Sequence, residues 1–453
     1  MTDIVFRAKR VVTPDGTRAA SVHVRGGIIA SVRAYDDVPA GCPIEDFGDR
    51  VLFPGIVDTH VHINEPGRTE WEGFESATRA AAAGGVTTLV DMPLNSIPPT
   101  TTLSGLETKA RSAEGRCMVD VGFVGGVVPG NMKELATVFA AGALGFKCFL
   151  AESGVDEFHH VNEPELRLAM TELARIGAPL LVHAELPGPL DAAAAKQGAI
   201  SEADARRYAT FLASRPRAAE DEAVDMVIRL SRDLRTRAHV VHLSSSDALV
   251  AIRRARDADV PVSAETCPHY LSFAAEEIAD GATEFKCAPP IREKENREKL
   301  WDALREGLID QVVTDHSPST PALKCSGSGD FVKAWGGISS LQLGLAAVWT
   351  GARARGRTID DLARWMCAAP ARLVGLEARK GSIQVGCDAD FVVWDPDAEF
   401  RVNAAELYHR HKLTPYQDRT LHGSVVSTWL RGAKIYESGR FQAPRGQWMR
   451  KAR

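Results

Sequence analysis

The sequence of 453 residues contains no uninterrupted run of about 18 apolar residues, the minimum for a membrane-spanning helix. Met1 is followed by TDIVFRAKRVV, which lacks the charged, apolar and small-residue regions of a signal peptide. The formal net charge is −5, which gives no electrostatic reason to expect nucleic acid or an anionic membrane as a partner. We therefore expect a protein that is neither exported nor embedded in a membrane.

Cysteine is scattered through the chain, with eight residues and no CxxC pair. This pattern is typical of reduced thiols in a cytoplasmic protein rather than of a disulfide framework. The first strand expected in the middle of the chain is not followed by GxGxxG, so a dinucleotide-binding open sheet has no support from its usual motif.

Eight apolar, β-branched segments alternate with amphipathic segments through the middle of the chain. The amphipathic segments include FESATRAAAAGG and ELRLAMTELARIG, and several end in Gly, as helices often do. Alternating strands and helices with continuously apolar strands predict a (β/α)₈ TIM-like barrel, an α/β fold, with a doubly wound open sheet as the alternative. The expected strands are GIVDTHVH, GVTTLVDMP, VDVGFVGG, ALGFKCFL, APLLVHAE, AHVVHLSS, VPVSAETCPHY and IDQVVTDHSP.

Both ends of the chain consist of short β-rich segments separated by Gly and Asp, such as SVHVRGGIIASVR near the start and GCDADFVVWDP near the end. They predict a small β-sandwich domain assembled from both termini. We expect residues 1–54 and 374–453 to form this domain and residues 55–373 to form the barrel.

Polar side chains stand at the ends of five of the eight expected strands. The carboxyl ends of barrel strands carry the reactive residues of TIM-barrel enzymes. Imidazole and carboxylate groups together are typical ligands of zinc and similar metals. A core histidine or a helix-capping Asp explains one such residue, but not a set on five strand ends. Four of these strand ends carry the predicted metal ligands His60, His62, His183, His242 and Asp315, and the fifth carries Lys147.

Lys147 lies within the apolar strand GFKCFL, where burying an ammonium costs several kcal/mol unless it is paired or altered. An ion pair or a side chain reaching to solvent is one interpretation. The alternative hypothesis is that the amine, neutral beside two metal ions, reacts with CO₂ to form a carbamate that bridges them.

Three further histidines are less informative. His239 precedes His242 by three residues, so we expect it to face the opposite side of its strand and to be structural. His269 and His316 follow strand ends, where a supporting role and a plain loop position are equally compatible with the sequence.

The order HxH, Lys, His, His, Asp on a barrel between β-rich ends resembles the amidohydrolase superfamily, in its branch of dihydroorotases, hydantoinases and allantoinases. The resemblance implies two divalent metal ions per subunit, most often Zn, with Co, Mn or Fe also tolerated. It implies one ion bound by His60, His62 and Asp315, a second bound by His183 and His242, and N6-carboxylated Lys147 bridging both.

Several residues differ from the motifs of the related families, and these differences narrow the choice of substrate. Asn64 stands where dihydroorotases carry Arg, and Glu152 stands where hydantoinases and dihydropyrimidinases carry Tyr. The segment DMPLNS places Leu94 before Asn95, unlike the MPN of dihydroorotases. The segments that resemble the allantoinase family are HINEPGRTEWEG, GFKCFL, ETCPHYL, KCAPPIR, VTDHSP and KAWGGISSLQ.

The resemblance to allantoinases implies hydrolysis of allantoin to allantoate in purine degradation, with Asp315 acting first as base and then as acid. It also implies that main-chain groups near Cys287 and Ser317 bind the ring amide, with Asn95 nearby, and that the protein is a homo-tetramer or dimer. A hydantoinase or dihydropyrimidinase is the alternative within the same chemistry. A non-catalytic scaffold relative is the third.

Overall fold

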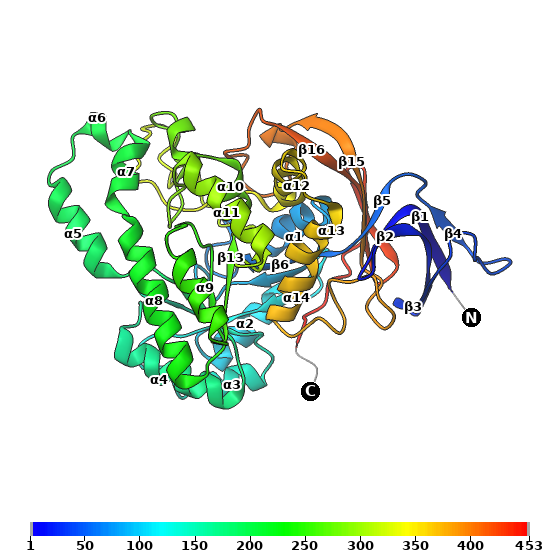
Figure 1. Ribbon diagram of the computed structural model, residues 1–453, viewed down its shortest axis with the longest axis horizontal. Helices are drawn as coiled ribbons and strands as arrows, with labels where there is room; N and C mark the ends of the chain where they lie inside the picture. The colour runs from blue at the N-terminus through cyan, green and yellow to red at the C-terminus, as the bar shows by residue number, and fades with distance from the viewer. Residues whose placement is uncertain (1–2, 451–453) are drawn as a thin grey trace.

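The computed structural model describes residues 3–450, so residues 1–2 and 451–453 of the predicted β domain lie outside the described part of the chain. Figure 1 shows a barrel surrounded by helices, with a sheet built from both ends of the chain at one side. The blue N-terminal strands and the orange C-terminal strands lie together there.

The barrel is built from eight parallel strand positions, all among the eight segments expected from the sequence. A bridge between Val61 and His316 links the first and eighth strands, and the His62 N–H donates to the His316 oxygen at 2.8 Å. The predicted fold class is therefore confirmed. The strands are β6 (Ile56–Val61), β7 (Val86–Asp91), β8 (Asp120–Phe123) continued by β9 (Gly125–Gly126), β10 (Phe146–Phe149), β11 (Leu180–His183), β12 (Ala238–Val240), β13 (Val262–Thr266) and β14 (Gln311–Val312).

Helices cover the outside of the barrel, as the amphipathic segments predict. α4 (Glu163–Ile176) shows why they begin and end where they do: Asn162 and Glu165 form a capping box, and Gly177 ends the helix at φ 69°. No helix within residues 3–450 combines the length and apolar character needed to cross a bilayer. The others are α1 (Phe74–Ala83), α2 (Leu103–Ala113), α3 (Leu135–Ala140), α5 (Pro187–Gln197), α6 (Glu202–Ala205), α7 (Tyr208–Ser214), α8 (Arg217–Leu234), α9 (Leu249–Asp257), α10 (Pro268–Ser272), α11 (Lys294–Glu306), α12 (Gly344–Ala354), α13 (Ile359–Ala363) and α14 (Ala369–Leu373).

The terminal sheet has nine strands in the order β18-β17-β16-β15-β5-β1-β2-β3, with β4 paired to β1. Its two halves meet where β5 pairs antiparallel with β15, Pro54 opposite Phe391. The division of the chain into a terminal β domain and a barrel at residues 54 and 374 stays a prediction. The strands are β1 (Ile4–Thr13), β2 (Gly16–Arg25), β3 (Ile28–Arg33), β4 (Ile44–Asp46), β5 (Val51–Pro54), β15 (Phe391–Arg401), β16 (Thr420–Leu430), β17 (Ala433–Glu437) and β18 (Arg440–Phe441).

Alternate side chains along these strands point to opposite faces of the sheet and contribute to two hydrophobic cores. Phe53 and Trp394 belong to the large core shared with the barrel, and their rings lie 5.9 Å apart. Phe6 and Trp429 belong to a separate small core, with ring centroids 4.9 Å apart. Because neighbouring residues of a strand face opposite sides, one sheet serves both cores.

A buried ion cluster and the C-terminal segment also join the sheet to the barrel. Lys380 Nζ lies 2.6 Å from Asp120 Oδ2 of β8 and 2.6 Å from Asp390 Oδ2 beside β15, and 2.8 Å from Asp388 Oδ2. Residues 446–449 then run along β8, where the Val121 N–H donates to the Gln447 oxygen at 2.9 Å.

Candidate metal centre and substrate cavity

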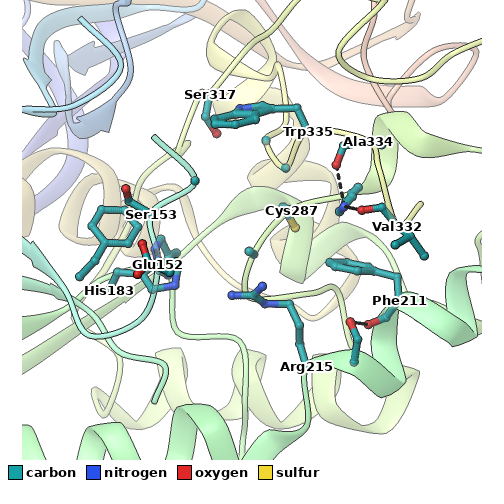
Figure 2. Close-up of a pocket in the computed structure, with 18 of the residues that line it drawn as sticks. Glu152, Ser153, His183, Phe211, Arg215, Cys287, Ser317, Val332, Ala334 and Trp335 are labelled. Carbon is teal, nitrogen blue, oxygen red and sulfur yellow. Dashed lines mark hydrogen bonds between the residues drawn. The ribbon is translucent and has the colours of Figure 1, made fainter. Parts of the chain in front are cut away.

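One cavity of about 500 Å³ at the carboxyl ends of the barrel strands is lined by all the residues predicted for the site. Figure 2 shows His183 and Glu152 on one wall, Phe211 and Arg215 on another, and Trp335 above the opening. The predicted residues that it brings together are His60, His62, Asn95, Lys147, His183, His242, Cys287, Asp315 and Ser317.

The first group of potential metal ligands is His60, His62 and Asp315, all buried, with ligand atoms within 4.8 Å of one another. Asp315 Oδ1 lies 3.3 Å from His60 Nε2 and 3.4 Å from His62 Nε2. Burial alone would raise the pKa of Asp315, but His60 and His62 hold it well below its ordinary value, so the carboxylate stays ionised. Burial lowers the pKa of His62 to about 4.

The other neighbour of His60 indicates which of its ring nitrogens carries the hydrogen. His60 Nδ1 lies 2.5 Å from Glu265 Oε1, so Nδ1 carries the hydrogen and Nε2 keeps its lone pair. Nε2 is buried and has no hydrogen-bond partner among residues 3–450. A lone pair facing the Asp315 carboxylate lacks a hydrogen to share with it, and a divalent cation satisfies both groups.

The second group is His183 with His242. His183 Nδ1 lies 3.0 Å from His242 Nε2, while His183 Nε2 lies 2.8 Å from Glu185 Oε2. Burial lowers the pKa of both histidines, that of His242 to well below its ordinary value. Glu185 accepts the Nε2 hydrogen of neutral His183, which leaves the Nδ1 lone pair turned toward His242. These two imidazoles fit a second metal ion.

Lys147 lies between the two groups on β10 and is only 1% exposed. Its Nζ lies 5.2 Å from the centre of the Phe149 ring, and no salt bridge or hydrogen bond of this amine is found within residues 3–450. Burial lowers the pKa of Lys147 to about 8, which enlarges the fraction of neutral amine. The ion-pair interpretation of this lysine has no partner in the described chain.

Three of the predicted site residues have a backbone conformation that is rare outside glycine. The φ angles are 71° at Asn95, 40° at His242 and 44° at Asp315. Left-handed conformations at such residues cost roughly 1–3 kcal/mol each and cluster at functional sites. At His242 and Asp315, this turn directly after the strand aims the side chain into the cavity mouth.

The interpretation of His239 as facing away from the site is wrong. His239 lies inside the barrel, with Nε2 3.0 Å from Glu265 Oε2, and so takes part in the hydrogen-bond chain that ends at His60. Strict alternation fails between His239 and His242 because β12 ends at Val240 and His242 turns to positive φ. Glu265, on β13, is a supporting residue that the sequence pattern does not predict, although it is the first residue of the segment ETCPHYL.

The expected substrate contacts are placed around the same cavity. Asn95 Nδ2 lies 3.4 Å from His62 Nδ1, and Cys287 is buried in the cavity wall. The Ser317 N–H donates to the Ile338 oxygen at 3.0 Å, so the Ser317 carbonyl is the main-chain group left for a ligand. Asn64 instead donates to the Pro318 oxygen at 3.3 Å and is not among the residues that line the cavity.

The two remaining histidines after strand ends, His316 and His269, differ in their hydrogen bonds. His316 Nδ1 accepts from the Ser340 N–H at 3.1 Å, and its carbonyl closes the barrel, which is a structural role. His269 is fully buried beside Cys267 and Asp315, and neither of its ring nitrogens has a hydrogen bond within residues 3–450.

Comparison with known proteins agrees with this arrangement. Residues 51–435 match the profile of the amidohydrolase family. The chain therefore belongs to the amidohydrolase family.

Within that family its similarity is to allantoinases, as the sequence motifs predict. It is 55% identical to the allantoinase of Streptomyces avermitilis, over 98% of this chain and 98% of that protein. It is 44% identical to the allantoinase of Arabidopsis thaliana, over 96% of this chain and 88% of that protein. The predicted resemblance is confirmed.

Solved structures of similar shape are named hydantoinase or dihydropyrimidinase. The L-hydantoinase (dihydropyrimidinase) of Arthrobacter aurescens has a TM-score of 0.93 at 32% identity, covering 99% of this chain and 100% of that one. The dihydropyrimidinase of Brevibacillus agri has a TM-score of 0.90 at 29% identity, covering 99% and 98%. The fold is thus shared with proteins named hydantoinase and dihydropyrimidinase.

Proposed function

We propose that this protein hydrolyses the ring amide of allantoin to give allantoate, in purine degradation. The observation that carries the proposal is the convergence of six ligand-type side chains from five barrel strands on one cavity. The identity of 55% to an allantoinase supports the choice of ring.

Two divalent metal ions are proposed as cofactors. The donor set of imidazoles, one carboxylate and one buried amine suits Zn best and tolerates Co, Mn or Fe. Carboxylated Lys147 supplies the second anion that two dications need. One ion would be held by His60, His62 and Asp315, the other by His183 and His242, with carboxylated Lys147 between them.

When bound, such ions supply a water whose pKa falls from about 15.7 toward 7 and an electrophile for the ring carbonyl. Asp315 is the catalytic residue of this chain: it takes the proton from the attacking water and delivers it to the departing ring nitrogen. Its ionised state suits the first step. Ser317 and Cys287 bind the ring amide through main-chain groups, and Asn95 orients the substrate beside His62.

A parallel assay of metal-loaded protein on allantoin, hydantoin, dihydrouracil and dihydroorotate tests this function. We expect allantoin to have the highest kcat/KM of the four and dihydroorotate to be inert. Turnover of hydantoin without turnover of allantoin would transfer the assignment to the hydantoinases, which the shared fold supports as the second candidate. Protein that cannot take up metal would instead indicate a scaffold relative.

We further propose a cytoplasmic homo-oligomer, a tetramer or dimer. The scattered cysteines without a CxxC pair support the cytoplasmic location, and the resemblance to enzymes that commonly assemble supports the oligomer. One relative, from Aquarana catesbeiana, is named a mitochondrial allantoinase, so localisation has to be measured with a tagged full-length chain. Light scattering coupled to size-exclusion chromatography measures the assembly.

A further inference from the structure

Arg215 occupies the cavity wall without a role in the reaction described above. It follows α7, in the helical excursion between β11 and α8, and it lines the same cavity as the predicted metal ligands. Figure 2 shows its guanidinium directed into the space between His183 and Cys287. The Arg215 side chain is 22% exposed.

One edge of this guanidinium is fixed by Glu185. Arg215 Nε donates to Glu185 Oε1 at 3.0 Å and Nη2 donates to Glu185 Oε2 at 2.6 Å. Glu185 Oε2 is also the oxygen that lies 2.8 Å from His183 Nε2. The guanidinium is therefore held one carboxylate away from a predicted metal ligand.

The other end of the guanidinium keeps its donors. An arginine has five N–H donors, and the fork on Glu185 uses one on Nε and one on Nη2. Both hydrogens of Nη1 and one of Nη2 remain, and no hydrogen bond of Nη1 is found within residues 3–450. These donors form a rigid end-on pair suited to a planar oxygen acceptor.

The other cations around the cavity are differently engaged. Lys286 Nζ donates to the Val332 and Ala334 oxygens at 3.1 and 2.6 Å. Lys333 is 81% exposed and lies 3.4 Å from Asp330. Apart from Lys147, Arg215 is thus the lining cation within residues 3–450 that has both a fixed position and uncommitted donors.

The net charge of the Arg215–Glu185 pair indicates which kind of ligand group would accept hydrogen bonds from Arg215. Glu185 is fully buried and forms a salt bridge with Arg215 at 2.6 Å, so the two side chains form a neutral pair, unlike an unpaired arginine, which would attract a carboxylate. We propose that the end of the Arg215 guanidinium donates to the carbonyl oxygen of the ureido group that allantoin carries on its ring. Arg215 would thereby set the preference for allantoin over unsubstituted hydantoin. This inference rests on the proposed function.

The test compares wild type with Arg215→Lys on allantoin and hydantoin. A lysine ammonium can still form an ion pair with Glu185. It has no planar fork of N–H donors, however, so it cannot pair with Glu185 and at the same time present two donors to the cavity. We expect kcat/KM for allantoin to fall about 10-fold or more, mainly through KM, and kcat/KM for hydantoin to stay within about 3-fold. Where hydantoin is not turned over, its inhibition constant takes the place of kcat/KM.

Arg207→Lys is the matched control, because Arg207 lies at the start of α7, pairs with Asp204 and is 57% exposed. Arg207→Lys should leave kcat/KM unchanged for both allantoin and hydantoin. Equal losses on both substrates in Arg215→Lys, with or without loss of metal, would overturn the inference by reducing Arg215 to a support for His183.

A second measurement needs no variant. Wild-type protein should prefer a hydantoin with a ureido substituent to one with a methyl substituent at the same carbon by about 10-fold in kcat/KM. Equal kcat/KM for the two would overturn the inference. Wild type that opens hydantoin but not allantoin would instead refute the proposed function, so the two failures are distinguishable.

Discussion

Replacing Glu265 by Gln should weaken both the metal centre and the fold. The fully buried carboxylate accepts from His60 Nδ1 at 2.5 Å, from His239 Nε2 at 3.0 Å and from Gln311 Nε2 at 2.9 Å. A glutamine has one carbonyl oxygen for these three donors, so its NH₂ must face at least one N–H.

The least costly orientation can be worked out from the neighbours. If the new NH₂ faced His60, the imidazole would have to move its proton to Nε2, which is the atom turned toward Asp315. If the NH₂ faces His239 instead, that ring can accept at Nε2 and donate from Nδ1 to Ser263 Oγ, 2.7 Å away. The clash with Gln311 remains in this orientation. One unpaired buried donor costs about 1–3 kcal/mol of unfolding free energy.

Metal affinity should fall as well, because the anion behind His60 disappears. Losing such a supporting carboxylate typically costs about 10–100-fold in affinity. Zinc titration against a chromogenic chelator measures the affinity, and urea unfolding of the metal-free protein measures stability. Glu172→Gln, at an exposed ion pair with Arg175 on α4, is the control. A Glu265→Gln protein that matches wild type in both measurements would refute the reasoning.

The stability loss should also depend on pH. Burial alone would raise the pKa of Glu265, but His60 and His239 hold it well below the ordinary value of 4.5. A depressed pKa contributes stability that is present above the unfolded-state pKa and is lost as pH falls toward the folded-state value. The difference between wild type and Glu265→Gln should therefore be largest near pH 7 and shrink below about pH 4.5. A difference that grew on acidification would contradict this sign.

Three further perturbations test other parts of the molecule. Lys147→Ala should abolish turnover and be partly rescued by short carboxylic acids; near-normal activity would contradict a bridging carbamate. Lys380→Met removes a cation shared by three buried carboxylates, and Asp390 then has no salt bridge within residues 3–450, so urea unfolding at pH 7 should show a loss of about 3–5 kcal/mol. Gly337→Ala would place a Cβ 2.1 Å from the Ser317 oxygen at a φ of 137°, so KM for allantoin should rise several-fold while bound metal is unchanged.

The site residues at the strand ends could be predicted from the sequence because each of them is a polar residue in an otherwise apolar strand. His60, Lys147 and Asp315 are conspicuous for that reason, and the barrel brings them together without further information. The alternation of strands and helices predicted the barrel for the same local reason.

Residues that act through a partner on another element gave no such signal. Glu265 meets His60 across 205 positions of sequence, and Arg215 meets Glu185 across 30. The prediction for His239 is wrong because period-two alternation does not account for the left-handed backbone of His242. Such supports follow from tertiary packing and appear only when the strands are placed in space.

The pairing of β5 with β15 has a consequence for the making of the protein. The two strands are separated by about 340 residues, so the edge of β5 that faces β15 has no strand partner in the nascent chain until β15 has been translated. At typical synthesis rates of roughly 5–20 residues per second, this wait lasts tens of seconds. The N-terminal strands are thus a place where chaperones would bind, and where a slow codon downstream would favour aggregation.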